Sequence, residues 1–321
     1  MSKREKIKKV NKVDILIISN QYDYTTDYVC IELSRRNTNY LRLNRDSFTN
    51  YQIKFNVNLG ELYITCSGNN YLIDDSLKSV YYRAPTHFRE TFIKKHTSEQ
   101  QLYNSQWMSF VRNLTFFESA KWMNNPLNTF KAENKLLQLK YASSLGFQIP
   151  ETIVANDISN LDLKPGSQLA VKALDTALFT IGQKEAFFYT NIVESDEIIK
   201  YNAKSIPLVY QNNLHPKIDY RVTVAGEDIY CAKILNKGNG IIGDWRKQKY
   251  KLDFIDCNLP LDVKTKCFDL TSKFKLHFGG IDLIESKDGF YFIEINPTGE
   301  WAWLVDAADH KVYKSIAGFL I

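Results

Sequence analysis

The chain has 321 residues, of which 44% are hydrophobic and 24% charged, and its formal net charge is +5. This composition indicates a globular protein with enough apolar surface for a substantial core. The first twelve residues hold six Lys or Arg against one acid, which leaves 35 basic and 35 acidic residues in the rest of the chain, so a clustered basic surface for nucleic acid is not expected.

The cysteines and the hydropathy pattern indicate the compartment in which the protein is expected to act. The five cysteines show no CxxC pair, so neither a zinc site nor a disulfide framework is indicated. No apolar run approaches the roughly 20 residues of a membrane span. We therefore expect a soluble, cytoplasmic protein without a nucleic-acid or membrane partner, whose basic residues 1–12 form a disordered tail.

Residues 13–123 are predicted to form one small α/β domain. The run VDILIIS at 13–19 is typical of a buried parallel strand, and the helical pattern at 26–36 follows it. A long helical pattern covers 98–117. Further strands are predicted at 40–43, 53–57, 62–66 and 80–83.

The turn-forming sequence NNPLN at 124–128 marks a boundary, after which we expect a central subdomain over 124–213. It begins with one helix over 129–145 that Gly146 ends. Its predicted strands lie at 151–157, 169–174, 186–193 and 207–213, with a short helix at 196–205.

A C-terminal subdomain is expected over 214–321. It opens with a hairpin at 220–235, where AGED supplies the turn, and continues with a helix at 260–276. It then contains the segments IDLIE and FYFIEIN. The fold class is therefore mixed α/β (α+β).

The second hairpin places polar side chains together. If Lys287, Asp288 and Gly289 form a three-residue loop, Ser286 pairs with Phe290 and Asp282 lies opposite Glu294. The period of two then puts Asp282, Glu294 and Asn296 on one face. The other face receives the apolar residues Ile281, Leu283, Ile293 and Ile295.

This pairing calls for a cation. Two carboxylates about 4 Å apart repel by roughly 4 kcal/mol at an effective dielectric constant of 20. Asp, Glu and an amide oxygen are ligands that Mg²⁺ accepts. The alternative is an amphipathic hairpin whose polar face is simply solvated. In the same way, Lys172 in a strand and Lys135 on a helix could be surface residues whose stems pack on apolar neighbours.

Taken in chain order, these features resemble the ATP-grasp superfamily. The likeness is closest to the graspetide synthetases, which are microviridin-type peptide ligases related to ribosomal S6 glutamate ligase. The segments that carry it are YYRAP (81–85), residues 122–157, VYQNN (209–213), DYRVTVAGEDIY (219–230), GDWR (243–246), IDLIE (281–285) and EINPTGEWAWL (294–304).

The resemblance implies an ATP-grasp fold with an N-terminal α/β pre-ATP-grasp domain, and it implies roles for matching residues. Lys135 and Lys172 would contact the ATP phosphates, and Arg221 and Arg246 would be the catalytic arginines. The hinge that grips adenine would consist of Gln211, Asn212, Asn213 and Leu214. The ligands of two Mg²⁺ ions would be Asp282, Glu294 and Asn296.

The implied activity is ATP-dependent macrocyclisation of a ribosomal precursor peptide through acyl phosphates, with residues 176–190 as the lid. A homodimer is possible. Glu300 replaces a frequent Gln and Ala84 a frequent Arg, which could alter peptide recognition. The alternatives are a carboxylate-amine ligase of the S6 or glutathione-synthetase kind and a nucleotide-binding protein without turnover.

Overall fold

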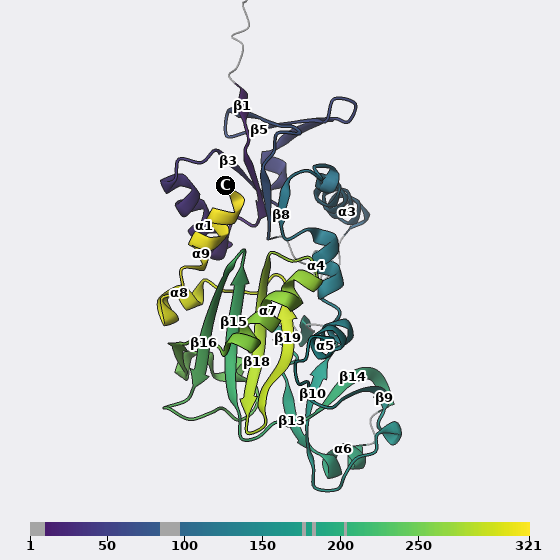
Figure 1. Cartoon of the computed structure of the whole chain (residues 1–321). Coiled ribbons are helices and arrows are strands. Elements are labelled where there is room, and N and C mark those ends of the chain that lie inside the picture. The colour runs from purple at the N-terminus through teal and green to yellow at the C-terminus, as the bar shows by residue number, and fades with distance from the viewer. Residues whose placement is uncertain (1–9, 84–96, 175–177, 182–183, 202–203) are drawn as a thin grey trace, which may run out of the picture. The chain divides into compact units, whose positions relative to one another are not determined.

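The computed structural model describes residues 10–83, 97–174, 178–181, 184–201 and 204–321 (Figure 1). The chain divides into two compact units, residues 1–127 with 313–321 and residues 128–312. The boundary expected after residue 123 lies close to this division, whereas residues 313–321, which the sequence assigned to the last subdomain, belong to the first unit. In the described part, no helix is long and apolar enough to cross a membrane.

The first unit contains a parallel sheet. Its central strand β2 (Ile15–Ser19) is fully buried and leads into helix α1 (Tyr24–Arg35), whose N-cap is Asp23. Helix α9 (Val312–Leu320) joins this unit through the hydrogen bond from Ser79 Oγ to Leu320 O, 2.6 Å long. The strand order is β3 (Tyr40–Asn44), β2, β7 (Ser79–Tyr82) and β8 (Lys121–Met123).

A second sheet in this unit includes strands that the sequence did not predict. Its order is β1 (Val10–Lys12), β6 (Asn69–Ile73), β5 (Glu61–Cys66) and β4 (Gln52–Asn56). Because β1 pairs with β6, the expected disordered tail does not extend to residues 10–12, and residues 1–9 lie outside the described residues. The predicted helix 98–117 is α3 (Ser98–Asn113), followed by the 3₁₀ turn Leu114–Phe116. Another 3₁₀ turn covers Phe48–Asn50.

The single helix predicted over 129–145 is wrong. Two helices stand there, α4 (Pro126–Ala132) and α5 (Lys135–Ser144). The break occurs because Asn134 adopts an extended backbone and its side chain caps α5, accepting a hydrogen bond of 2.9 Å from the Leu137 backbone N–H. The apolar periodicity continues across this break and therefore concealed it.

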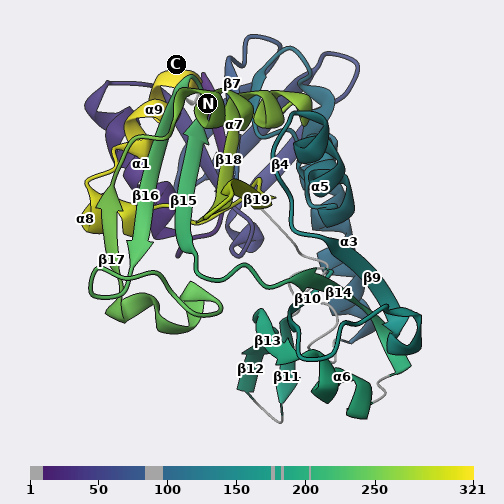
Figure 2. The same ribbon diagram turned by 60° about the horizontal axis from the view of Figure 1, so that its bottom comes forward.

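The second unit contains two sheets and a small hairpin (Figure 2). The first sheet has the order β13 (Asn191–Glu194), β10 (Gln168–Ala173), β14 (Lys204–Asn212) and β9 (Thr152–Asp157). The one strand predicted at 186–193 is instead split between β12 (Lys184–Phe187), which pairs with β11 (Leu178–Ile181), and β13. This hairpin falls within the predicted lid, of which residues 176–177 and 182–183 lie outside the described residues. Helix α6 (Ser195–Tyr201) and the 3₁₀ turn Ile158–Asn160 complete this part.

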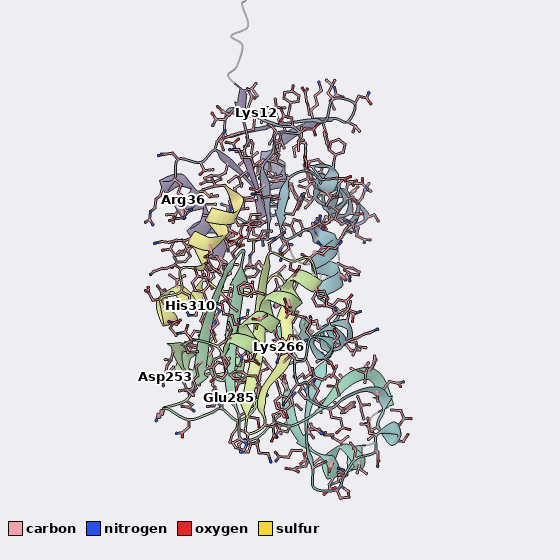
Figure 3. All side chains as sticks on the ribbon, in the orientation of Figure 1. Lys12, Arg36, Asp253, Lys266, Glu285 and His310 are labelled. Atoms are coloured by element: carbon pink, nitrogen blue, oxygen red, sulfur yellow. The ribbon has the colours of Figure 1, made fainter. Side chains whose placement is uncertain are left out.

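The second sheet is antiparallel and covered on one face. Its order is β17 (Asp253–Asp256), β16 (Asp228–Leu235), β15 (Ile218–Ala225), β18 (Phe278–Ser286) and β19 (Gly289–Asn296). Helix α7 (Leu261–Lys273) lies across this face in Figure 1, and α5 contacts β19. Figure 3 marks Lys266 on α7 and Glu285 on β18. The 3₁₀ segment Trp245–Lys251 and helix α8 (Trp303–Ala308) flank the sheet.

One face of this sheet packs against α5 and α7 and forms an apolar core. Fully buried residues of this core include Val222, Ile281, Phe292 and Cys267. Because side chains alternate along each strand, Arg221 and Asp282 project away from this core.

Candidate active site

The hairpin of β18 and β19 brings the two predicted carboxylates together. Asp282 pairs with Glu294, as the sequence predicts, although the assumed loop is wrong. The loop has two residues, and Ser286 pairs with Gly289, whose φ of 112° lies in the region that favours glycine. A register shift between Asp282 and Leu283 compensates for the shorter loop, so the predicted pairing survives.

The register shift changes which side chains face the site. Leu283 pairs with Phe292, and Asp282 pairs with Glu294, so Ile293 is the extra residue of a β-bulge. Phe292 remains in the core, whereas Ile293 lines the cavities described below. The predicted position of Ile293 on the apolar face is therefore wrong, and the bulge is the reason.

Three cationic side chains neutralise the carboxylate pair. Arg246 Nη2 contacts both Asp282 Oδ2 and Glu294 Oε1, the latter at 2.6 Å. Arg221 Nη1 donates to Asp282 Oδ1 at 2.9 Å. Lys135 Nζ donates to Glu294 Oε2 at 2.8 Å. The positive charge that the pairing requires is thus supplied by side chains from α5, β15 and the segment after β16.

Local structure explains how Lys135 reaches Glu294. The N-cap at Asn134 makes Lys135 the first residue of α5. Gln138, one turn later and 4% exposed, fastens α5 to β19, because its Nε2 donates to Ile295 O at 2.9 Å and its Oε1 accepts from Ile295 N at 3.1 Å. Sequence reasoning missed Gln138, although its spacing of three residues places it on the same helix face as Lys135.

Arg221 is buried in a space that two glycines leave open. It lies on β15 directly opposite Asp282, and its side chain is 6% exposed. A Cβ atom on Gly280 would stand 2.3 Å from Arg221 Nη2, and one on Gly299 2.5 Å from it. A side chain at either position would therefore displace the guanidinium from the place that it occupies.

Replacement of Gly280 tests this packing. We expect Gly280→Ala to displace the Arg221 guanidinium and lower the free energy of unfolding by about 1–3 kcal/mol, because the added methyl group overpacks a full space. Urea unfolding measures this change. The control is Gly318→Ala in α9, where the new Cβ would meet Arg36 Nη1 at an ordinary 3.8 Å. Equal losses in the two variants would contradict the proposed crowding.

The cluster shifts the proton affinities of its members. The pKa of Glu294 lies well below its ordinary value because Lys135 and Arg246 stabilise the carboxylate against the cost of burial. Burial lowers the pKa of Lys172 to about 8, with Lys135 and Arg246 adding to the shift and Glu294 opposing it. Glu294 is thus ionised at neutral pH, whereas Lys172 loses its proton at a pH of about 8.

The third predicted metal ligand lies beside this cluster. Asn296 is exposed, and its Oδ1 accepts hydrogen bonds from Thr298 N at 3.0 Å and Thr298 Oγ1 at 3.2 Å. Over the described residues, no three His, Cys, Asp or Glu side chains gather in a way that could hold a metal. A metal here therefore needs the amide oxygen as well as the two carboxylates, and that donor set fits Mg²⁺.

Two adjoining cavities receive the remaining predicted residues. The larger, about 470 Å³, is lined by Lys135, Lys172, Arg221, Arg246, Glu294 and Asn296, together with Lys249, Glu300 and Trp303. The smaller, about 70 Å³, is lined by Gln211, Asn212, Asn213 and Leu214, together with Lys172, Lys217 and Asp219. The structure thus brings together all the site residues that the sequence predicts, with Asp282 lining the smaller cavity.

Two of the predicted hinge residues are held by side-chain hydrogen bonds. Gln211 Nε2 donates to Thr152 Oγ1 at 2.9 Å, and Asn212 Nδ2 donates to Glu151 Oε2 at 2.8 Å. Because these amides are bonded to β9 and the residue before it, they fix the position of the end of β14 against the smaller cavity.

Sequence reasoning missed four charged residues at the cavities, Lys217, Asp219, Asp244 and Lys249. Lys217 and Asp219 form a buried pair in which Lys217 Nζ lies 2.6 Å from Asp219 Oδ1. Together with Arg221 they recur every second residue from the position just before β15 into that strand, which was a usable signal. Lys249 lies 4.1 Å from the Trp303 ring centroid and three residues after Arg246. Burial, with Arg221 nearby, lowers the pKa of Lys249.

Comparisons with known proteins give structural likeness only. No family model matches the sequence, and no curated protein matches it. A RiPP-associated ATP-grasp ligase from Chryseobacterium gregarium, solved with ADP and a leader and core peptide, is 24% identical, with a TM-score of 0.78 over 97% of this chain and 96% of that one.

Two macrocyclases from Microcystis aeruginosa MRC are also similar in structure. MdnC, solved with the precursor peptide MdnA, is 21% identical, with a TM-score of 0.76 over 95% of this chain and 98% of that one. MdnB is 22% identical, with a TM-score of 0.73 over 98% and 99%. The expected resemblance is confirmed at the level of structure: the chain has the fold of the ATP-grasp ligases.

Proposed function

We propose that this protein is an ATP-dependent ligase that activates Asp or Glu side chains of a ribosomally made precursor peptide as acyl phosphates. It then closes ester links to Ser or Thr side chains or amide links to Lys. The observation that carries this proposal is the carboxylate pair Asp282 and Glu294, surrounded by Lys135, Arg221 and Arg246 at the junction of two cavities. Such an arrangement suits a nucleoside triphosphate and an anionic substrate.

The nucleotide lies along the two cavities in this proposal. The smaller cavity, at the end of β14, takes adenine against Gln211 to Leu214. Lys135 and Lys172 hold the phosphates. Asp282, Glu294 and Asn296 hold one or two Mg²⁺ ions, which when bound neutralise phosphate charge and orient the γ-phosphoryl group.

The chemistry has two steps. The peptide carboxylate attacks the γ-phosphorus of ATP, ADP leaves, and an acyl phosphate forms. A hydroxyl or amine of the same peptide then attacks the acyl carbon, inorganic phosphate leaves, and the nucleophile loses its proton. Arg221 is suited to bind the acyl phosphate or the acceptor carboxylate, because it lines the larger cavity and its buried Nε has no hydrogen-bond partner among the described residues.

Exclusion of water completes the proposed site, because hydrolysis of the acyl phosphate would waste ATP. Residues 176–190 are proposed to act as the lid, and Tyr189 and Thr190 line the larger cavity. The Chryseobacterium ligase is described with ADP and peptide, and MdnC with a precursor peptide, which supports a peptide substrate. A cytoplasmic site of action is part of the same proposal.

The pKa of Lys172 leads to a pH-dependence of nucleotide binding. Because its pKa is about 8, Lys172 loses its charge as the pH rises through that value. We expect the affinity for metal-free ATP to fall about tenfold between pH 7 and pH 9.5, measured by calorimetry in EDTA. Lys172→Arg, which remains charged, should abolish this decline. Wild-type affinity that is constant over the range would contradict the assigned phosphate contact.

Co-expression with candidate precursor peptides tests the proposed function. The peptide to be tested is the product of any small open reading frame beside the gene that repeats Thr, Ser or Lys with Asp or Glu. Mass spectrometry should show the loss of one water for each ring closed. An unchanged peptide, with ADP release stimulated by free amino acids instead, would favour the carboxylate-amine ligase.

A further inference from the structure

Two cysteines outside the proposed active site lie side by side. Cys231 is on β16 and is 4% exposed, and Cys257 directly follows β17 and is half-buried. Their sulfur atoms are 3.5 Å apart. The Cys257 backbone N–H also donates to Cys231 O at 3.0 Å, which continues the ladder in which Ala232 pairs with Asp256.

Cross-strand geometry permits a covalent bond here. Residues directly opposite each other in an antiparallel pair have Cα atoms about 4.5–5.5 Å apart, and disulfides span Cα separations of about 4.4–6.8 Å. Both thiols are free in the structure. The backbone therefore holds the two side chains within the range of a disulfide, and only side-chain rotation is needed.

We propose that Cys231 and Cys257 form a reactive dithiol that low-molecular-weight disulfides, such as oxidised glutathione, convert into an intramolecular disulfide. This proposal is independent of the proposed ligase function, because neither thiol lines the two cavities described above.

The chemistry begins at the more accessible sulfur. The Cys257 thiolate attacks one sulfur of oxidised glutathione, forms a mixed disulfide, and releases one glutathione thiolate. Cys231 then loses its proton and attacks Cys257 Sγ, which releases the second glutathione. Two protein thiols are oxidised, and one glutathione disulfide is reduced to two thiols.

The surroundings favour this order of attack. In the structure the Cys257 thiol donates to Cys231 Sγ. Once Cys257 is ionised, its thiolate instead accepts a hydrogen bond from the Cys231 thiol, which lowers the pKa of Cys257, and Lys233 adds to this effect. The same hydrogen bond and burial raise the pKa of Cys231. The other thiols differ, because burial raises the pKa of Cys66 and raises that of Cys267 to about 12.

The disulfide would close a loop that contains residues 232–256 between Cys231 and Cys257. This segment contains the 3₁₀ segment Trp245–Lys251 and therefore Arg246. Closing it restricts the unfolded chain, so the oxidised protein should unfold at a temperature several degrees higher than the reduced protein. Asp256, next to Cys257, is further held by His310 Nε2 at 2.9 Å, and Figure 3 marks His310 and Asp253 near this edge of the sheet.

The test uses the full-length protein, reduced with dithiothreitol, desalted, and equilibrated with oxidised glutathione. Alkylation in denaturant followed by peptide mass spectrometry should show one cross-linked peptide, joining Cys231 to Cys257, while Cys30, Cys66 and Cys267 remain alkylated. The protein mass should fall by two hydrogen atoms. Oxidation should also raise the midpoint of thermal unfolding.

Matched variants separate the dithiol from general thiol reactivity. Cys257→Ser and Cys231→Ser should each abolish the cross-link and the rise in unfolding temperature. Cys66→Ser, at another half-buried thiol, should change neither result. A stable glutathione adduct on Cys257 without the cross-link, or no reaction while the protein is folded, would overturn the proposal.

Discussion

Glu294→Gln should lower the rate of ATP turnover about 10²–10³-fold while the protein remains folded. The amide keeps the shape of the side chain but removes the charge that Lys135 Nζ and Arg246 Nη2 contact at 2.8 Å and 2.6 Å. It also removes one carboxylate from the proposed Mg²⁺ ligands. ADP release in the presence of the precursor peptide measures the effect, and circular dichroism verifies the fold.

The low pKa of Glu294 means that the carboxylate is charged at the pH of the assay. Because the folded-state pKa lies below that of the unfolded chain, the ionised carboxylate stabilises the fold above about pH 4.3, and this stabilisation is lost as the pH falls through the folded-state pKa. The wild-type charge is therefore complete at the assay pH. Glu227→Gln, the same change in the exposed turn between β15 and β16, is the control. Near-normal turnover by Glu294→Gln would refute the assigned role.

The carboxylate pair could be predicted from sequence because a strand has a period of two. Asp282 and Glu294 were correctly placed opposite each other, but two errors cancelled. The loop is one residue shorter than assumed, and the bulge at Ile293 restores the register. Nothing in FYFIEIN distinguishes a bulged residue from a regular one, since the bulge depends on packing Phe292 and Ile295 into the core.

The positions of the cations were less predictable. The resemblance indicated Lys135 and Arg246, but their partners depend on contacts between distant parts of the chain. Lys135 reaches Glu294 because Asn134 interrupts a helical pattern that appeared continuous. Gln138 has a role only because Ile295 on β19 offers its backbone N–H and C=O to it. Local propensity contains no information about such tertiary partners.

Arg246→Gln should bind Mg²⁺ more tightly than the wild type in the absence of nucleotide, by about tenfold or more, and yet turn over ATP about 10²–10³-fold more slowly. In the structure, the Arg246 guanidinium contacts the same two carboxylates that are proposed to hold the metal. A metal must displace these contacts, and a hydrogen bond to a charged group contributes about 1.5–3 kcal/mol. The glutamine removes this competition and also removes the positive charge proposed for the phosphoryl group.

Binding and turnover must be measured separately for this prediction. Calorimetry with Mg²⁺ alone, or Mn²⁺ as a spectroscopic probe, reports the first quantity, and ADP release reports the second. Lys251→Gln, at the exposed end of the same 3₁₀ segment, is the control and should change neither. If Arg246→Gln binds the metal more weakly, the arginine positions the two carboxylates for the metal and does not compete with it. Only opposite changes in affinity and rate agree with a side chain that occupies the metal position at rest and acts on the phosphoryl group during turnover.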